Sequence, residues 1–187
     1  MALLPLVIAP DPRLKTKSEP VAAVTEEIRM LAFDMLETMY HERGVGLAAV
    51  QVGVLMRLIV ADVDWREEEQ GKQWVFINPE ILELSDKPHT YKEGCLSFPD
   101  QFADVERPER VRVRFTDLDG QVREKTFTGL LATCVQHEID HINGITFVDH
   151  ISRIKKDMIL RKLQKLKKAG AFDHDHDHVH GEHCNHG

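Results

Sequence analysis

The stretch GLLATCVQHEIDHING, residues 129–144, carries two histidines four positions apart, with a glutamate directly after the first. Its apolar residues recur at helical spacing, and the Asn-Gly pair at its end is a typical helix stop. Residues four apart share one face of a helix, so His137 and His141 can both point at one metal ion. Glu138 would then lie beside a water molecule at that metal, as a general base. The spacing predicts a metal-dependent hydrolytic site on a helix.

A chance match on a solvated surface helix is the alternative interpretation of these histidines. Leu130 and Cys134 share the helical face of His137 and His141, which indicates that this face is buried. Two buried imidazoles need a polar partner, and one metal ion can serve both. The sequence therefore favours a buried helix at the centre of the fold.

The surrounding sequence contains both strand and helix patterns. Apolar residues at helical spacing follow Thr25 and predict an amphipathic helix. Strands are predicted at 55–63, 74–84 and 110–128, and the last is a hairpin with an Asp-Gly turn. A basic amphipathic helix is predicted at 151–168. The fold class is α+β, with mainly antiparallel strands packed around a buried central helix carrying the HExxH motif, and a C-terminal amphipathic helix.

Composition limits the possible functions. The 187 residues, 42% hydrophobic and 29% charged, are ordinary for one soluble globular domain. The net charge of −7 argues against a DNA-binding protein. No apolar run is long enough for a membrane span, and LLPLVIAP at 3–10 lacks the features of a signal peptide. Three cysteines suit a reducing compartment, so we expect a cytoplasmic protein without membrane contact.

A catalytic metal site needs a third protein ligand and an open position. Downstream of the helix, Asp149 and His150 are candidates, but the glycine-spaced continuation of one group of zinc proteases is missing there. Upstream, EGCLSFP at 93–99 places Cys95 after a glycine in a polar turn, an unusual position for a core cysteine. We interpret Cys95 as a thiolate ligand and Cys134 as a buried core residue.

The glycine-rich stretch GVGLAAVQVG, residues 44–53, contains a single amide side chain, Gln51. It could be a plain connector, or be mistaken for a dinucleotide fingerprint, but the third glycine of that motif is absent. A more specific interpretation is that an extended peptide lies along this loop. Gln51 would then donate a hydrogen bond to an oxygen that becomes negative.

Together, three motifs of the chain resemble the hallmarks of the polypeptide deformylase family. These are G-x-G-L-A-A-x-Q at 44–51, E-G-C-L-S at 93–97 and Q-H-E-x-D-H at 136–141, each complete and in the family's order. The resemblance covers roughly residues 5–165. Small departures exist, such as Ile142 where leucine is commoner, and we expect these to be packing changes.

The resemblance implies hydrolytic removal of the formyl group from the N-terminal formyl-methionine of newly synthesised proteins, with release of formate. It implies a metal held by Cys95, His137 and His141. Glu138 would be the general base, while the Gln51 side chain and the backbone N–H of Leu96 would stabilise the carbonyl oxygen. Substrate binding is assigned to residues of the two upstream motifs: Val45, Gly46, Glu93 and Gly94.

The identity of the metal is open from ligand types alone, because a Cys-His-His set suits zinc. The resemblance implies one Fe²⁺ per chain, with Zn²⁺, Ni²⁺ or Co²⁺ as substitutes. Two other classes of protein are possible: a zinc endopeptidase that shares only the helix motif, and a metal-binding or storage protein. The presence of Gln51, Cys95 and Glu138 together argues against both.

Two features lie beyond these motifs. Residues 153–168 carry eight basic residues and one acidic residue. They form either a solvated helix, docked by Ile154, Met158, Leu163 and Leu166, or, as the resemblance implies, a contact with the ribosome.

The second feature is the C-terminal sequence. We predict a catalytic domain at 1–168 and a disordered His/Asp-rich tail at 169–187, which the family pattern does not include. DHDHDHVHGEHCNHG at 173–187 holds six of the eleven histidines of the chain. The tail is either inert or a binding segment for transition metals.

Overall fold

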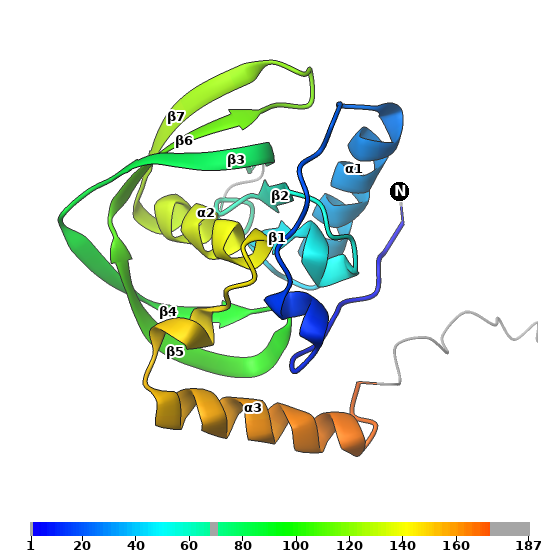
Figure 1. The fold of residues 1–187 in the computed structure, drawn as a ribbon, viewed down its shortest axis with the longest axis vertical. Coiled ribbons are helices and arrows are strands. Elements are labelled where there is room, and N and C mark those ends of the chain that lie inside the picture. The colour runs from blue at the N-terminus through cyan, green and yellow to red at the C-terminus, as the bar shows by residue number, and fades with distance from the viewer. Residues whose placement is uncertain (1, 68–70, 173–187) are drawn as a thin grey trace, which may run out of the picture.

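The computed structural model describes residues 2–67 and 71–172 (Figure 1). Within them the helices are α1 (Glu26–His41), α2 (Gly129–Ile142) and α3 (Arg153–Lys168), with short 3-10 helices η1 (Pro12–Lys15), η2 (Ala49–Val52) and η3 (Phe147–His150). The strands are β1 (Gly46–Ala48), β2 (Leu58–Ala61), β3 (Trp74–Leu84), β4 (Pro88–Cys95), β5 (Phe98–Pro108), β6 (Arg110–Thr116) and β7 (Val122–Thr128). The predicted helices, and strands in each predicted strand region, are therefore present.

The strands form two antiparallel sheets, a five-stranded one in the order β1-β2-β3-β6-β7 and a two-stranded one of β4 and β5. Strand β6 shows why the sequence RVRVRFT forms a strand: its apolar residues are buried, while its arginines alternate toward solvent. The hairpin from β6 to β7 pairs Thr116 with Val122 across the predicted Asp-Gly turn. The α+β class with antiparallel strands is confirmed.

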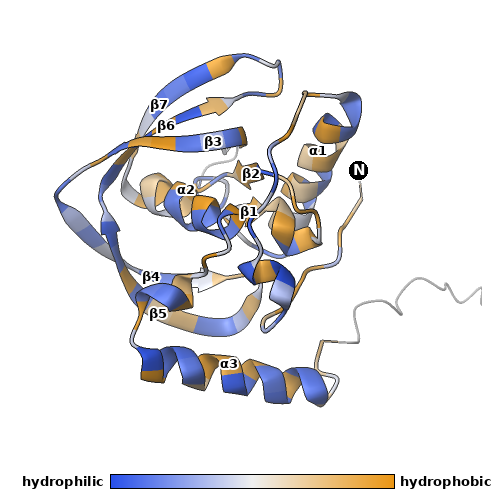
Figure 2. Ribbon diagram, in the orientation of Figure 1, coloured by the Kyte–Doolittle hydropathy of each residue, from blue (hydrophilic) through white to orange (hydrophobic). Residues whose placement is uncertain are grey.

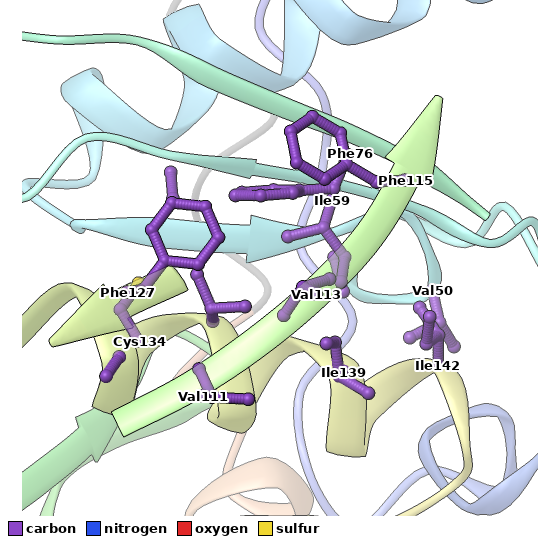
Figure 3. Packing of buried hydrophobic residues seen from close by; sticks show 14 residues of the cluster. Val50, Ile59, Phe76, Val111, Val113, Phe115, Phe127, Cys134, Ile139 and Ile142 are labelled. Atoms are coloured by element: carbon purple, nitrogen blue, oxygen red, sulfur yellow. The ribbon is translucent and has the colours of Figure 1, made fainter. Parts of the chain in front are cut away.

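Helix α2 lies between the two sheets (Figure 1). Figure 3 shows Ile139 of α2 next to Val113 of β6, and Ile142 of α2 next to Val50, in one buried cluster. Burial of each such side chain stabilises the fold by about 1.5–3 kcal/mol. Ten of the fourteen residues of α2 are buried, so the helix is covered on nearly all sides and not on one face alone.

Helix α1 covers the opposite face of the five-stranded sheet. Its N-cap is Thr25, whose side chain accepts a hydrogen bond from the Ile28 N–H at 3.4 Å. Strand β2 is buried on both faces: Leu58 and Val60 pack in the α1 cluster, and the alternate residues pack in the α2 cluster. The sheet is therefore sandwiched between α1 and α2.

The two-stranded sheet has no counterpart among the predicted strands. Strand β4, PHTYKEGC, is largely polar and buries only one residue, Glu93. Strand β5 has a proline near each end, a feature that argues against a strand in sequence analysis. The pairing of β4 with β5 decides their structure, and it creates the second wall around α2.

Helix α3 lies on the outside of the molecule, and Figure 2 shows that it is mainly hydrophilic. Only Leu163 of this helix is buried, within a cluster that also contains Ile159 and Leu160. The predicted docking face was wrong for three of its four residues, because Ile154, Met158 and Leu166 are 75%, 66% and 36% exposed. None of the helices in residues 2–67 and 71–172 has the length and apolar character that a bilayer span requires.

Of the predicted disordered tail, only residues 169–172 belong to the described part of the chain. They form a hydrogen-bonded turn at the end of α3, in which the Ala171 N–H donates to the Leu166 carbonyl at 3.0 Å. These four residues therefore continue from α3 as a defined turn. Residues 173–187 lie outside the described residues.

Candidate active site

The side chains of Cys95, His137 and His141 meet between β4 and α2. Cys95 is the last residue of β4, where the pairing with β5 shifts register, and the histidines lie one helical turn apart on α2. One ligand atom from each residue lies within 4.8 Å of the others, and Cys95 Sγ is 3.2 Å from His141 Nε2. The fold thus brings together the three residues that the sequence singled out.

The chemistry of these residues fits a divalent transition metal. Tetrahedral metal bonds of about 2.0–2.3 Å separate ligand atoms by about 3.6 Å, which is compatible with this cluster. Burial, reinforced by the nearby His137, holds the pKa of His141 well below its usual value, which keeps this imidazole in the neutral, ligating form. Within the described residues, His141 Nδ1 is buried without a hydrogen-bond partner.

His137 is oriented by a buried carboxylate. Its Nδ1 lies 2.8 Å from Glu93 Oε1, which leaves Nε2 as the ring nitrogen available to a metal. Burial alone would lower the pKa of His137, but hydrogen bonds to Cys95 and Glu93 outweigh it and raise that pKa well above its usual value. Metal binding at this imidazole therefore displaces a proton.

An arginine that the sequence analysis missed completes this support. Arg107 Nε and Nη2 donate to both oxygens of Glu93, at 2.7 and 3.1 Å, and Nη1 donates to Asp140 at 2.8 Å. The Arg107 and Glu93 side chains are each 5% exposed. His150 Nε2 lies 2.7 Å from the same Asp140 carboxylate, which extends the network to the surface. Glu93 and Asp140 belong to the recognised motifs at 93–97 and 136–141, but Arg107 lies outside all three motifs, so no sequence pattern marked it.

Glu138 projects from α2 beside His137 and is 4% exposed. No described residue hydrogen-bonds its Oε2 atom. Burial, with the charges of Glu93 and Asp140, raises the pKa of Glu138 to about 7. A carboxyl group with this pKa can both accept and return a proton near neutral pH.

Close approach of β1 to α2 depends on Gly46. A Cβ atom there would lie 2.6 Å from Cys134 Sγ and 2.8 Å from Glu138 Oε1, so a larger residue would displace one of them. Cys134 is itself 6% exposed, and burial raises its pKa well above that of an ordinary thiol. This environment agrees with the interpretation of Cys134 as a buried core residue.

Gln51 lies on η2 with its amide group fixed on both sides. Its Oε1 accepts from the Ala48 N–H at 2.9 Å, while Nε2 donates to Ser97 Oγ at 3.2 Å and approaches Cys95 Sγ at 3.4 Å. The N–H groups of this side chain therefore point toward Cys95 and Ser97. This is the orientation that a hydrogen-bond donor to a substrate oxygen requires.

An open cleft of about 1300 Å³ leads to this cluster. Its walls include every residue that the sequence analysis assigned to substrate binding or the carbonyl oxygen: Val45, Gly46, Gln51, Glu93, Gly94 and Leu96. The carboxylate of Glu93 is fully engaged with His137 and Arg107. Glu93 can therefore act on substrate through its backbone, while its side chain supports the site.

The two downstream candidates for a third ligand lie outside the cluster. Asp149 accepts hydrogen bonds from Lys15 and Lys156, and His150 pairs with Asp140. Asp149 thus connects η1 and α3 to η3, and His150 connects η3 to the end of α2. Among the described residues the cluster that could hold a metal consists of Cys95, His137 and His141.

Comparison with known proteins places this site in a family. The family model described as polypeptide deformylase matches residues 3–157. Peptide deformylase of Rhodopseudomonas palustris (strain TIE-1) is 53% identical over 172 residues, which cover 91% of this chain and 98% of the relative. Peptide deformylase of Bartonella henselae is 53% identical over 168 residues, covering 90% of this chain and 95% of that protein.

Solved structures agree with these relatives. The crystal structure of peptide deformylase from Ehrlichia chaffeensis has a TM-score of 0.86 and 39% identity, over 91% of this chain and 99% of the other. The Ehrlichia chaffeensis enzyme in complex with actinonin has a TM-score of 0.85 and 42% identity, over 90% and 99% of the two chains. The chain therefore belongs to the polypeptide deformylase family.

Proposed function

We infer that this chain is a metal-dependent peptide deformylase acting in the cytoplasm. It removes the formyl group from the N-terminal formyl-methionine of newly synthesised proteins and releases formate. One observation supports this inference above the others: the buried carboxylate of Glu138 lies beside the cluster of Cys95, His137 and His141, at the base of an open cleft. No described residue forms a hydrogen bond with Oε2 of this carboxylate.

The three clustered residues hold the metal ion in this proposal. A divalent metal held there would lower the pKa of a water molecule and polarise the formyl carbonyl. Glu93 keeps His137 in the orientation that presents Nε2, and despite burial the hydrogen bonds to His137 and Arg107 hold the pKa of the Glu93 carboxyl below its usual value. The protein thereby supplies a preformed ligand set on two rigid elements.

Glu138 carries the proton in the reaction. It accepts a proton from water as the water oxygen adds to the formyl carbon, and then passes that proton to the amine as the C–N bond breaks. The carbonyl oxygen gains negative charge during the addition. Gln51 Nε2 and the backbone N–H of Leu96 donate to that oxygen, which lowers the barrier.

The substrate peptide lies in the cleft in extended form. Its backbone pairs with the β1 side at Val45 and Gly46, and with the β4 side at Glu93 and Gly94. Gly46 packs closely against Glu138 and Cys134 in the wall of the cleft, and we propose that the space beside the reacting carbon is correspondingly narrow. A formyl group, which carries only hydrogen on that carbon, fits there better than an acetyl group.

Fe²⁺ is the proposed physiological metal, and Zn²⁺, Ni²⁺ or Co²⁺ can substitute. The thiolate of Cys95 and two imidazoles accept all four ions by ligand type.

The proposed metal and activity are tested together by anaerobic purification, followed by metal analysis and by an assay on a formyl-methionyl peptide. The acetyl-methionyl peptide is the control. We expect one metal per chain and turnover of the formyl substrate alone. Equal turnover of both peptides, or cleavage of internal bonds, would refute the assignment.

We further propose that α3 contacts the ribosome, where formylated chains emerge. Seven of its eight basic residues are exposed; the eighth, Lys156, is partly buried and pairs with Asp149. The test is co-sedimentation with ribosomes at increasing salt, because phosphate contacts weaken as salt rises.

The variant for this test reverses four charges of α3 to glutamate: Arg161, Lys162, Lys165 and Lys168. The matched control reverses four exposed basic residues of β6 and β7: Arg112, Arg114, Arg123 and Lys125. We expect only the α3 variant to lose salt-sensitive binding. Retention by the α3 variant would exclude this contact.

A further inference from the structure

Gly44, which directly precedes the two β1-side residues assigned to substrate binding, is held at its N–H by helix α1. The Gly44 N–H donates to the Met39 carbonyl at 2.8 Å, and the Arg43 N–H donates to the Tyr40 carbonyl at 3.0 Å. Arg43 between them has φ +62°. This pair of hydrogen bonds around a left-handed residue is the Schellman arrangement that ends a helix. The N–H side of Gly44 is therefore fixed by the end of α1.

The carbonyl side of Gly44 is held by a tryptophan from another part of the chain. Trp65 lies in a turn that is closed by a hydrogen bond of 3.1 Å from the Glu67 N–H to the Asp64 carbonyl. The indole Nε1 of Trp65 donates to the Gly44 carbonyl at 2.9 Å, and this bond is partly buried. A Cβ atom at Gly44 would lie 2.8 Å from Leu96 Cδ1, so the Leu96 side chain closes a third side.

The ring of Trp65 is itself held in place. It meets the ring of Tyr40 edge to face, with the centroids 5.3 Å apart, and the Arg66 guanidinium lies 5.4 Å from its centre. The Tyr40 hydroxyl donates to Asp62 at 2.7 Å, and Asp62 is 1% exposed. Burial, with the nearby Asp62 carboxylate, raises the pKa of Tyr40 to about 12, so this hydroxyl keeps its proton and remains a donor. The indole is therefore fixed against the same helix that holds the Gly44 N–H.

The segment 62–65 thus binds two consecutive carbonyls of the chain that leads into β1. Besides the bond from Trp65 to Gly44, the Asp62 N–H donates to the Val45 carbonyl at 2.9 Å. Gly44, Val45 and Gly46 all line the active-site cleft. The geometry of these three residues therefore depends on contacts with a segment that lies outside all three recognised motifs.

We propose that Trp65 is a positioning residue for peptide binding in the active-site cleft. Its indole N–H holds the Gly44 carbonyl and so keeps Val45 and Gly46 in the orientation that pairs with an extended substrate. This inference rests on the deformylase function proposed above. Without the indole N–H, the glycine at 44 has many accessible conformations, and a peptide would have to order the strand as it binds. Glu138 and the two histidines, on α2, would be unaffected.

The first test is the kinetics of Trp65→Phe on the peptide formyl-Met-Ala-Ser. Phenylalanine keeps an aromatic ring near Tyr40 but has no N–H group. We expect KM to rise about 3–10-fold, the usual contribution of one hydrogen bond, with kcat changed by less than about two-fold. Calorimetric binding of the product peptide Met-Ala-Ser should weaken by the same factor. Equal KM and equal peptide affinity in the two proteins would overturn the role of Trp65.

Trp74→Phe is the matched control. Trp74 packs against the rings of Phe76 and Phe127 in the α2 cluster. We expect this substitution to lower the free energy of unfolding and to leave KM unchanged. A similar rise in KM for both tryptophan variants would mean that general loss of packing, and not the bond to Gly44, weakens binding.

A second replacement separates the hydrogen bond from the packing of the ring. The chain has two tryptophans, so in the Trp74→Phe background a tryptophan analogue enters at position 65 alone. Benzothienylalanine has the shape of tryptophan but carries sulfur in place of the N–H. We expect it to raise KM as Trp65→Phe does, and an unchanged KM would overturn the inference even where Trp65→Phe fails to fold. No turnover by the unchanged enzyme would overturn the proposed function, and this inference with it.

Discussion

Helices α2 and α3 are similar in length, with 14 and 16 residues, but their surroundings are opposite. Ten residues of α2 are buried, whereas α3 buries only Leu163. Both helices carry charged residues, and the environment determines what those charges can do. On α2, burial raises the pKa of Glu138 to about 7, so this carboxyl group can exchange protons near neutral pH. On α3, most basic side chains are solvated and remain available to a partner.

The two helices are also held by different forces. Close packing against both sheets fixes α2, and Ile142 is fully buried in its cluster. Helix α3 is attached by Leu163 and by the ion pair of its Lys156 with Asp149 of η3, which also accepts from Lys15 of η1 at 2.6 Å. Substitutions on α2 and its buried partners should therefore have large effects, and equivalent changes on α3 small ones.

The largest effect is expected for Glu138→Gln, since the amide cannot accept a proton from water. Turnover should fall by about 10²–10⁴-fold, the usual contribution of a general base. Metal content should be unchanged, because Cys95, His137 and His141 remain. The matched change on α3, Lys162→Gln, should leave turnover intact. Activity of Glu138→Gln within a few-fold of the unchanged enzyme would exclude the proton-transfer role.

Arg107→Met should cause the largest loss of stability. The substitution leaves the Glu93 carboxylate buried without its cation, which costs about 3–5 kcal/mol of the free energy of unfolding. Urea unfolding of the metal-free protein measures this cost. The control Arg114→Met removes an exposed pair with Glu124 and should cost less than about 1 kcal/mol. A second substitution, Glu93→Gln, should restore part of the loss in the double variant. Similar losses for the two arginine variants would contradict the buried network.

A pair of isoleucine substitutions tests packing directly. Ile142→Ala at the end of α2 removes a fully buried side chain and should cost roughly 3 kcal/mol through lost burial and cavity formation. Ile154→Ala on α3, where the side chain is 75% exposed, should change stability by less than about 0.5 kcal/mol. Chemical denaturation of both variants under the same conditions gives the comparison. Equal losses would mean that α3 is packed as firmly as α2.

Apart from the control substitutions, the smallest effect is expected for Asp149→Asn, and it should depend on pH. Burial raises the pKa of Asp149, but hydrogen bonds from Lys15, Lys156 and the Thr146 N–H outweigh burial and hold the pKa well below its usual value. A lowered pKa in the folded state means that the ionised form stabilises folding above about pH 4, and that this contribution disappears as the pH falls further.

At neutral pH the cost of this substitution should be about 1 kcal/mol, because both lysines are partly exposed. Unfolding at pH 7 and pH 3 should show a difference between the two proteins that shrinks at the lower pH. A difference that grows on acidification would contradict the ion-pair attachment of α3.

The sequence by itself determined which chemical groups α2 carries. His137 and His141 are four residues apart, a spacing that fixes their common face in any helix, and Glu138 follows from the same motif. Cys95 and Gln51 were identified by their motifs, and the structure brings both to the histidines. Local periodicity was also sufficient to predict α1, α3 and the hairpin of β6 and β7. The patterns of these elements depend only on residues that are close together in the sequence.

Only the tertiary structure showed how the site is supported. Arg107 is 33 residues from Asp140 and 14 from Glu93, and no local pattern marks an arginine that will be buried by strands from elsewhere in the chain. The same holds for β4 and β5, whose polar sequences become strands because they pair with each other around α2. The position of Phe172 in the cleft wall likewise depends on where α3 docks. Side-chain types and short spacings are properties of the sequence, whereas burial and long-range pairing arise only when distant segments pack together.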